Sequence, residues 1–234
     1  MHKPFFLALD FPTGEQAKSF LHKNSLDGVP VKVGMELFYR EGPSIVKWLK
    51  ENGHAIFLDL KLHDIPHTVE RAMFNLAKLG VDIVNVHGFG GSKMIQAAKK
   101  GLQEGAEEQV PKLIAVTLLT SMDQALLKNE LKIEGSIDKT AEHLAILAKN
   151  NGADGVVCSA NEAHLIKQAC GETFLTITPG IRLSDASKND QVRIATPSFA
   201  KKNGADYLVI GRTVTNANNP NKAYQQVVEE WERA

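Results

Sequence analysis

Short apolar segments alternate with amphipathic segments along the whole sequence, and this alternation limits the folds open to the chain. The apolar segments are rich in Val, Ile and Leu, as buried strands are. Eight occur, at residues 5–9, 29–33, 55–60, 83–86, 113–117, 155–158, 174–178 and 207–210. Between them, apolar residues recur three and four positions apart, which predicts helices. These predicted helices cover residues 15–22, 43–51, 68–79, 92–103, 140–149, 162–169 and 222–231.

Four of the predicted helices run into a glycine that precedes the next strand. The segments are Asn52-Gly53, Leu79-Gly80-Val81-Asp82, Asn151-Gly152-Ala153-Asp154 and Asn203-Gly204-Ala205-Asp206. Glycine just past a helix adopts the left-handed conformation that ends it. The segments resemble one another, which indicates repeated strand–helix units with a parallel sheet. Eight such units in 234 residues favour an α/β fold of one (β/α)8 TIM barrel, and we expect a single catalytic domain over residues 1–234.

Composition narrows the class of partner. The chain has 27 Lys and Arg against 27 Asp and Glu, so it lacks the long-range field with which nucleic-acid and membrane-surface binders gather their targets. We therefore expect a small-molecule partner, no nucleic acid and no membrane. Cys158 and Cys170 are too few for a disulfide framework, and no signal peptide or membrane span is predicted. These features predict a cytoplasmic protein.

Charged residues lie within or just after three of the predicted strands. Asp10 follows the first and Lys32 lies in the second. In the third, a period of two puts Asp59 and Lys61 on the face opposite the neighbouring leucines, so both are expected to project into the barrel. Buried charges require mutual pairing or a polar ligand. A structural ion pair is one alternative, and for Asp10 and Lys32 taken singly a solvated position at the rim is another.

The segment after the third predicted strand contains further polar groups. Asp64 precedes Pro66, where a helix commonly starts, so capping of that helix is its alternative role. His63 and His67 have a spacing that can join two imidazoles on a helix, but Pro66 lies between them and no third ligand follows at a recognisable spacing. We therefore predict no metal site.

Glycine and arginine recur near the ends of the last two predicted strands. The segments are Thr178-Pro179-Gly180-Ile181-Arg182 and Gly211-Arg212. TIM barrels often bind phosphate after strands seven and eight, where arginine offers two parallel donors. The polar segment 184–190 between them is typical of a closing lid, with a plain solvated loop as the alternative.

Four blocks, in order along the chain, resemble the orotidine 5'-monophosphate decarboxylase family, and most closely its bacterial members of the Bacillus type. The blocks are Lys32-Val33-Gly34-Met35-Glu36, the signature-like segment from Asp59 to Thr68, Thr178-Pro179-Gly180-Ile181-Arg182, and Gly211-Arg212. The resemblance implies decarboxylation of orotidine 5'-phosphate (OMP) to UMP and CO2, in de novo pyrimidine biosynthesis and without a cofactor.

The resemblance also implies roles for individual residues. Lys61 would protonate C6 of the pyrimidine after CO2 leaves, and Asp59 would face the substrate carboxylate. Lys32, Asp59, Lys61 and Asp64 would form an array of alternating charge. In that array Asp64, together with Thr68, would come from the other subunit of a homodimer.

The remaining implied contacts hold the rest of the substrate. Asp10 and Lys32 would bind the ribose hydroxyls, and Thr120 the base. Gln191 and Arg212 would bind the phosphate, and Arg182 and Gly211 would complete that end of the site.

Three other functions remain open. A class I aldolase also uses an interior lysine, but a Schiff-base lysine must be neutral, and two flanking carboxylates favour the ammonium form. A sugar-phosphate enzyme of the same barrel group would share the Asp59, Lys61 and Asp64 pattern but use Mg²⁺. A non-catalytic phosphate-binding barrel is the third, although mere binding does not need opposed charges.

Overall fold

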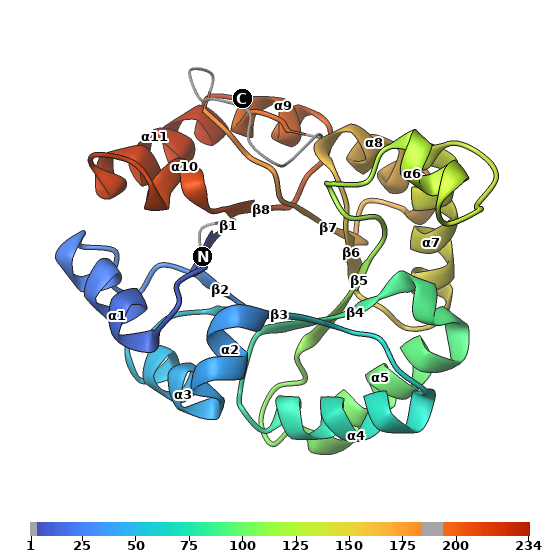
Figure 1. Cartoon of the computed structure of the whole chain (residues 1–234), viewed down its shortest axis with the longest axis horizontal. Coiled ribbons are helices and arrows are strands. Elements are labelled where there is room, and N and C mark those ends of the chain that lie inside the picture. The colour runs from blue at the N-terminus through green and yellow to red at the C-terminus, as the bar shows by residue number, and fades with distance from the viewer. Residues whose placement is uncertain (1–3, 184–193) are drawn as a thin grey trace.

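The computed structural model describes residues 4–183 and 194–234, and its eight parallel strands close into a barrel in sequence order (Figure 1). The barrel closes where β8 pairs with β1. The strands are β1 (Phe5–Ala8), β2 (Val31–Gly34), β3 (Ile56–Leu62), β4 (Ile83–His87), β5 (Lys112–Val116), β6 (Gly155–Val157), β7 (Leu175–Thr178) and β8 (Tyr207–Ile210). The predicted (β/α)8 TIM barrel is confirmed.

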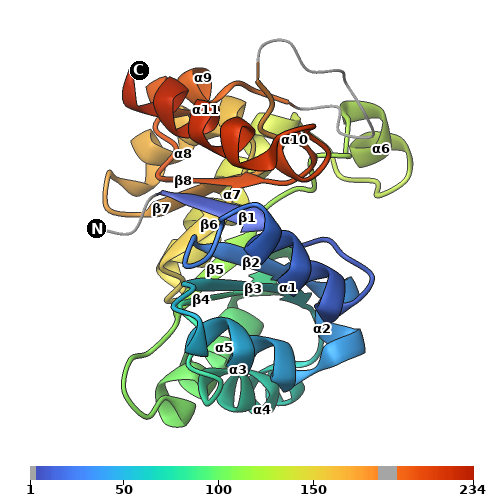
Figure 2. The same ribbon diagram turned by 90° about the vertical axis from the view of Figure 1, so that its left-hand side faces the viewer.

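Helices form a layer around the strands (Figure 1). Seven correspond to the predicted ones: α1 (Gly14–Lys23), α3 (Pro43–Glu51), α4 (Pro66–Ala77), α5 (Gly91–Gly105), α7 (Ile137–Asn150), α8 (Ala160–Cys170) and α11 (Pro220–Glu232). The described residues add short ones that were not predicted: α2 (Met35–Glu41), η1 (Gly88–Gly90), α6 (Gln124–Asn129), α9 (Pro197–Lys202) and α10 (Arg212–Thr215). In Figure 2, α2, α6 and α10 lie towards one end of the barrel. Within the described residues, no helix has the length and apolar character needed to cross a membrane.

The four glycines predicted to end helices all have left-handed backbones. Their φ angles are 78° at Gly53, 66° at Gly80, 91° at Gly152 and 87° at Gly204. A side chain at such a φ is sterically disfavoured, which explains why glycine occupies these turns.

Apolar side chains fill the barrel and the space between barrel and helices. Because strand residues alternate in direction, Phe57 and Ile83 point inwards, while Leu58 and Val84 pack against the helices. The inner cluster consists of Phe6, Ala8, Phe57, Ile83, Ile114, Ile177 and Val209, all buried. This cluster plugs the barrel, so a pocket can form only above it.

A polar contact recurs at the N-terminal end of alternate strands. Asp82, Asp154 and Asp206 precede β4, β6 and β8, and each accepts the amide of a residue in the preceding strand and the ammonium of a helix lysine. The amide bonds come from Ile56 (2.7 Å), Leu113 (2.7 Å) and Thr176 (2.8 Å), and the lysines are Lys50 (3.5 Å), Lys99 (2.8 Å) and Lys167 (2.7 Å). Each carboxylate therefore ties one helix to two strands, which accounts for the repeated Gly-x-Asp segments.

The three carboxylate contacts differ in the burial of their lysines, and we expect them to contribute differently to the free energy of unfolding. Asp206→Ala leaves the Lys167 ammonium, whose side chain is 5% exposed, with two backbone carbonyls but without its carboxylate, and should lower the free energy of unfolding by about 3–5 kcal/mol. Asp82→Ala affects Lys50, whose side chain is 38% exposed, and should cost about 1–2 kcal/mol through the lost bond to Ile56. Urea unfolding of both variants measures the difference. Equal losses would contradict the role assigned to burial.

Candidate active site

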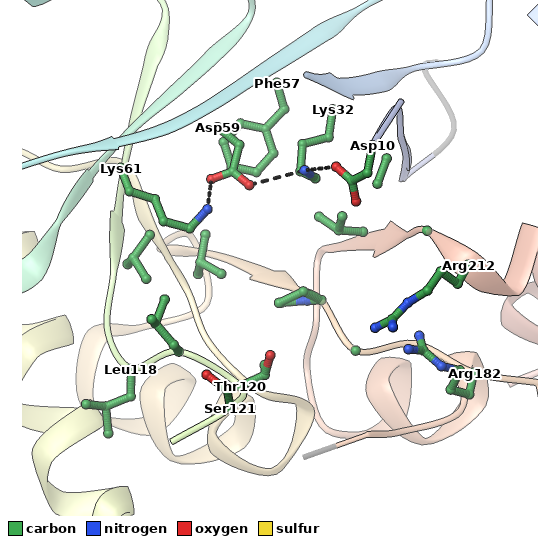
Figure 3. Close-up of a pocket in the computed structure, with 18 residues that line it drawn as sticks. Asp10, Lys32, Phe57, Asp59, Lys61, Leu118, Thr120, Ser121, Arg182 and Arg212 are labelled. Carbon is green, nitrogen blue, oxygen red and sulfur yellow. Dashed lines mark hydrogen bonds and ion pairs between the residues drawn. The ribbon is translucent and has the colours of Figure 1, made fainter. Parts of the chain in front are cut away.

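A pocket of about 310 Å³ opens at the C-terminal ends of the strands, above the apolar plug (Figure 3). Its apolar lining includes Phe57, Val116, Val157, Pro179 and Val209. Eight residues predicted for the site also line it: Asp10, Lys32, Asp59, Lys61, Thr120, Arg182, Gly211 and Arg212. The fold therefore gathers residues that lie up to two hundred positions apart in the sequence.

Four charged side chains form a row of alternating sign along one wall of the pocket (Figure 3). The Lys61 ammonium lies 2.6 Å from Oδ1 of Asp59, and Oδ2 of Asp59 lies 3.4 Å from the Lys32 ammonium. Lys32 in turn lies 3.1 Å from Asp10. The predicted pairing of charges inside the barrel is thus present, and the row ends at the more exposed Asp10.

Burial and pairing act in opposite directions on this row. Burial alone would lower the pKa of Lys32, but attraction by Asp59 and Asp10 outweighs it and raises the pKa above 10.5. Burial alone would raise the pKa of Asp59, yet Lys32, Lys61 and the hydrogen bond from Asn85 bring it below 3.8. Both groups therefore stay charged near neutral pH.

Gly34 leaves the space in which Lys32 meets Asp10. A Cβ at this position would lie 3.2 Å from Nζ of Lys32 and 3.4 Å from Oδ1 of Asp10. These contacts are tight for a methyl group, so any larger residue would press on the ion pair. The position belongs to the block after Lys32 that the sequence singled out.

The strand that carries Asp59 and Lys61 departs from regular pairing. Leu58 pairs with Val84 and Leu62 with Val86, so three residues of β3 lie opposite the single residue Asn85. Lys61 takes up the irregularity with a left-handed φ of 49°. The predicted shared face of Asp59 and Lys61 is correct, but it is reached through a bulge.

Asn85 is a polar residue of this region that the sequence analysis did not select. Its side chain is directed at β3, where it donates to Asp59 and accepts from the backbone N–H of Lys61. The available signal was an amide within the apolar segment 83–86. Ser121, beside Thr120 in the pocket lining, was also missed and carries no such signal.

The opposite part of the pocket carries two arginines. Arg182 follows β7 and Arg212 begins α10, and their guanidinium groups converge (Figure 3). Gly211 lies beside them at the end of β8, and Thr120 projects from the loop after β5. The pocket therefore offers two adjacent cations at one end and the Lys61–Asp59 pair at the other, with Asp10 of the charge row close to Gly211.

Asp64 and Thr68 lie outside this pocket. Both are exposed and line a separate open groove with Met35 and Tyr39, and Lys61 contributes to both cavities. The capping alternative for Asp64 is wrong, because Ile65 is the N-cap of α4 and no side chain caps that helix. Asp64 instead accepts a 2.6 Å bond from the Ile65 amide, a contact too local to reach the end of the helix.

His63 stacks on an aromatic neighbour. Its ring centroid lies 5.6 Å from that of His87, which stacks in turn on Phe89. Among residues 4–183 and 194–234, no group of three or more His, Cys, Asp and Glu side chains has a metal-binding arrangement. Gln191 and the predicted lid at 184–190 fall outside the described residues.

A family match, sequence relatives and a solved structure agree with one another. Residues 3–227 match the family described as orotidine 5'-phosphate decarboxylase / HUMPS. Orotidine 5'-phosphate decarboxylase of Geobacillus sp. strain WCH70 is 55% identical over 99% of this chain and 98% of its own length. The enzyme of the same name from Geobacillus thermodenitrificans is 54% identical over the same shares. The crystal structure of the Lactobacillus acidophilus orotidine 5'-phosphate decarboxylase is 43% identical, with a TM-score of 0.88 over 98% of this chain and 99% of that one.

We expect the charge on Asp59 to stabilise the fold in a pH-dependent manner. Asp59→Asn should lower the free energy of unfolding at pH 7 by about 1–3 kcal/mol, because Lys32 and Lys61 lose a charged partner. The folded-state pKa of Asp59 lies below 3.8, so its contribution is present above that pH and is lost as the pH falls through the folded-state pKa. Urea unfolding of wild type and variant from pH 7 downwards should show the two curves converging in acid. A difference independent of pH would contradict this interpretation.

Proposed function

The chain belongs to the orotidine 5'-phosphate decarboxylase / HUMPS family, and on that premise we propose that it converts OMP to UMP and CO2 in the charged pocket. It is a carboxy-lyase, and the observation that carries the proposal is the division of the pocket. The Lys61–Asp59 pair lies at one end and two converging arginines lie at the other, and the row of alternating charge runs between them along the wall. A nucleotide with a phosphate at one end and a reacting carboxylate at the other fits this arrangement.

The proposed orientation follows from charge. Arg212 and Arg182 hold the phosphate together with Gly211, since guanidinium groups bind phosphate through parallel donors. Gln191, in the segment outside the described residues, is assigned to the same phosphate. Asp10 and Lys32 bind the ribose hydroxyls, and Thr120 binds the base. Held in this way, the pyrimidine presents C6 and its carboxylate to Asp59 and Lys61.

The reaction needs a cation at a fixed place. As the bond between C6 and the carboxylate breaks, CO2 leaves and the electron pair stays on C6 in the plane of the ring, outside the π system. The Lys61 ammonium, held by its 2.6 Å contact with Asp59, stabilises that charge and then delivers its proton to C6. The neutral lysine regains a proton from solvent. Asp59 faces the substrate carboxylate and disfavours the ground state until CO2 departs.

We propose that the active unit is a homodimer. Asp64 and Thr68 are exposed in the single chain, and Ile65 and Tyr39 nearby are 67% and 69% exposed. Apolar side chains this exposed, grouped around a charged groove, are typical of a surface that another protein covers. In the dimer, Asp64 of one subunit extends the charge row of its partner beyond Lys61, and Thr68 contacts the substrate there.

Residues 1–234 act as one catalytic domain, the reaction uses no cofactor, and the protein works in the cytoplasm as part of pyrimidine biosynthesis. Cys158 and Cys170 are buried and form no disulfide, which supports a reducing location.

The first test is conversion of OMP in excess EDTA, followed by ultraviolet absorbance with identification of UMP as product. We expect rapid conversion that EDTA does not affect. Lys61→Ala should abolish turnover because the proton donor is lost, while UMP still binds through the arginines.

Two results would overturn the proposal. If the folded protein leaves OMP intact but acts on a pentulose or hexulose phosphate once Mg²⁺ is supplied, the chain is a metal-dependent relative. Near-normal turnover by Lys61→Ala would remove that residue from the mechanism.

Subunit complementation tests the shared site. Lys61→Ala and Asp64→Ala, each inactive alone, should recover roughly a quarter of wild-type activity when co-assembled in equal amounts, because half of the dimers are mixed and each has one intact site. Co-assembly of Lys61→Ala with Asp59→Ala is the matched control, since both residues lie in the same subunit's pocket and no intact site forms. Activity no higher than the sum of the separate variants would exclude a contribution of Asp64 across the interface.

A further inference from the structure

Asn85 makes two short hydrogen bonds to the two residues at the centre of the charge row. It is 1% exposed and lies on β4, between the outward-facing residues Val84 and Val86. Its Nδ2 donates to Oδ1 of Asp59 at 2.7 Å, and its Oδ1 accepts the backbone N–H of Lys61 at 2.8 Å. One planar amide thus holds a carboxylate and a backbone group from the same strand.

The hydrogen bond from the Lys61 N–H to the Asn85 side chain takes the place of a backbone hydrogen bond between β3 and β4. Three residues of β3 lie opposite Asn85 alone, so the backbone of β4 has too few acceptors for the bulged segment. The side-chain oxygen of Asn85 supplies the acceptor for Lys61, at the residue whose φ is 49°. A non-glycine residue in this region persists only where its surroundings hold it.

The two partners require both a donor and an acceptor at residue 85, and an amide supplies both. A backbone N–H can only donate and an ionised carboxylate can only accept, so the partner needs an acceptor and a donor on one short side chain. The same requirement fixes which end of the Asn85 amide is oxygen. Leucine has a similar size but offers neither group, and aspartate would set a second negative charge beside Asp59.

We propose that Asn85 is a positioning residue, which aims the Lys61 ammonium at C6 and fixes the Asp59 carboxylate between its two lysines. The proposal rests on the proposed decarboxylation. Among the described residues that line the pocket, Asn85 does not appear, so it acts through Asp59 and Lys61 and not by touching the substrate. Because Oδ1 of Asp59 is shared by Asn85 and the Lys61 ammonium, loss of the amide frees both groups to rotate.

The test separates kcat from KM in Asn85→Leu. We expect kcat for OMP to fall about 100-fold, because a displacement near 1 Å of a reacting group costs about that factor. KM should stay within about threefold of the wild-type value, since the arginines and Thr120 are untouched.

Thr176→Val is the matched control. Thr176 is also fully buried and its hydroxyl is also hydrogen-bonded, to the carbonyl of Gly204 and to the carboxylate and backbone N–H of Asp206, but at the opposite end of the barrel. It should lose stability, as Asn85→Leu does, and keep its kcat.

Asn85→Asp provides a second readout that does not depend on the leucine variant folding. The groups that face residue 85 are Asp59 and Lys61 of β3, with Lys32 of β2 beyond Asp59. A protonated carboxyl can still donate to Asp59, whereas an ionised one repels it. The kcat of this variant, relative to wild type at the same pH, should therefore fall as the pH rises.

Three outcomes of the Asn85→Leu and Thr176→Val measurements would overturn the inference while leaving the proposed function intact. They are a kcat of Asn85→Leu within about threefold of wild type, a loss confined to KM, and an equal loss of kcat in Thr176→Val. A constant relative kcat of Asn85→Asp across pH would overturn it as well. If the wild-type enzyme itself does not convert OMP, the proposed function fails, and the inference fails with it.

Discussion

The site depends on the pairing of the Asp59 carboxylate with its neighbours. The carboxylate accepts from Lys61 and Asn85 on one oxygen and lies beside Lys32 on the other, so two elements other than its own converge on it. A buried carboxylate is tolerated only when such partners compensate its lost hydration, and the lowered pKa of Asp59 reports that they do. Buried Lys32 in turn is paired by Asp59 and Asp10, and partly buried Lys61 by Asp59. The charges are therefore mutually required, and a change at one of them alters the others.

The charged site and the contacts that stabilise the barrel lie at different levels of the barrel. At the N-terminal end, Asp82, Asp154 and Asp206 join helices to strands through repeated carboxylate contacts. Between the two ends, inward-facing residues such as Phe57 and Ile114 form an apolar plug. Chemistry at the C-terminal end can thus tolerate charge and strain, because stability is supplied elsewhere. On β3 a residue of the stabilising core is followed by a residue of the charged site, because Phe57 belongs to the apolar plug and Asp59 lies in the pocket above it.

Periodicity was enough to predict the fold, since the strands are mostly buried apolar segments and four of them follow a glycine that ends a helix. The short helices were missed because three to seven residues, as in η1 and α2, give too few turns to show a periodic pattern. In the site, charges within apolar strands revealed Asp59, Lys61 and Lys32, because a buried charge is rarely tolerated without a reason. Asn85 escaped notice because a single amide costs less to bury, and its importance comes from a bulge between β3 and β4 that depends on the register of two strands.

That bulge also connects the pocket with the proposed dimer surface. The left-handed backbone at Lys61 costs about 1–2 kcal/mol relative to an ordinary strand conformation, and the bond to Asn85 helps to offset it. In return, Lys61 stands where the charged pocket meets the exposed groove that contains Asp64 and Thr68. A regular strand would continue its ladder with β4 through these positions. With the bulge, pairing resumes only at Leu62, the last residue of β3, so the chain leaves the sheet one residue after Lys61 and continues to Asp64 in the exposed groove.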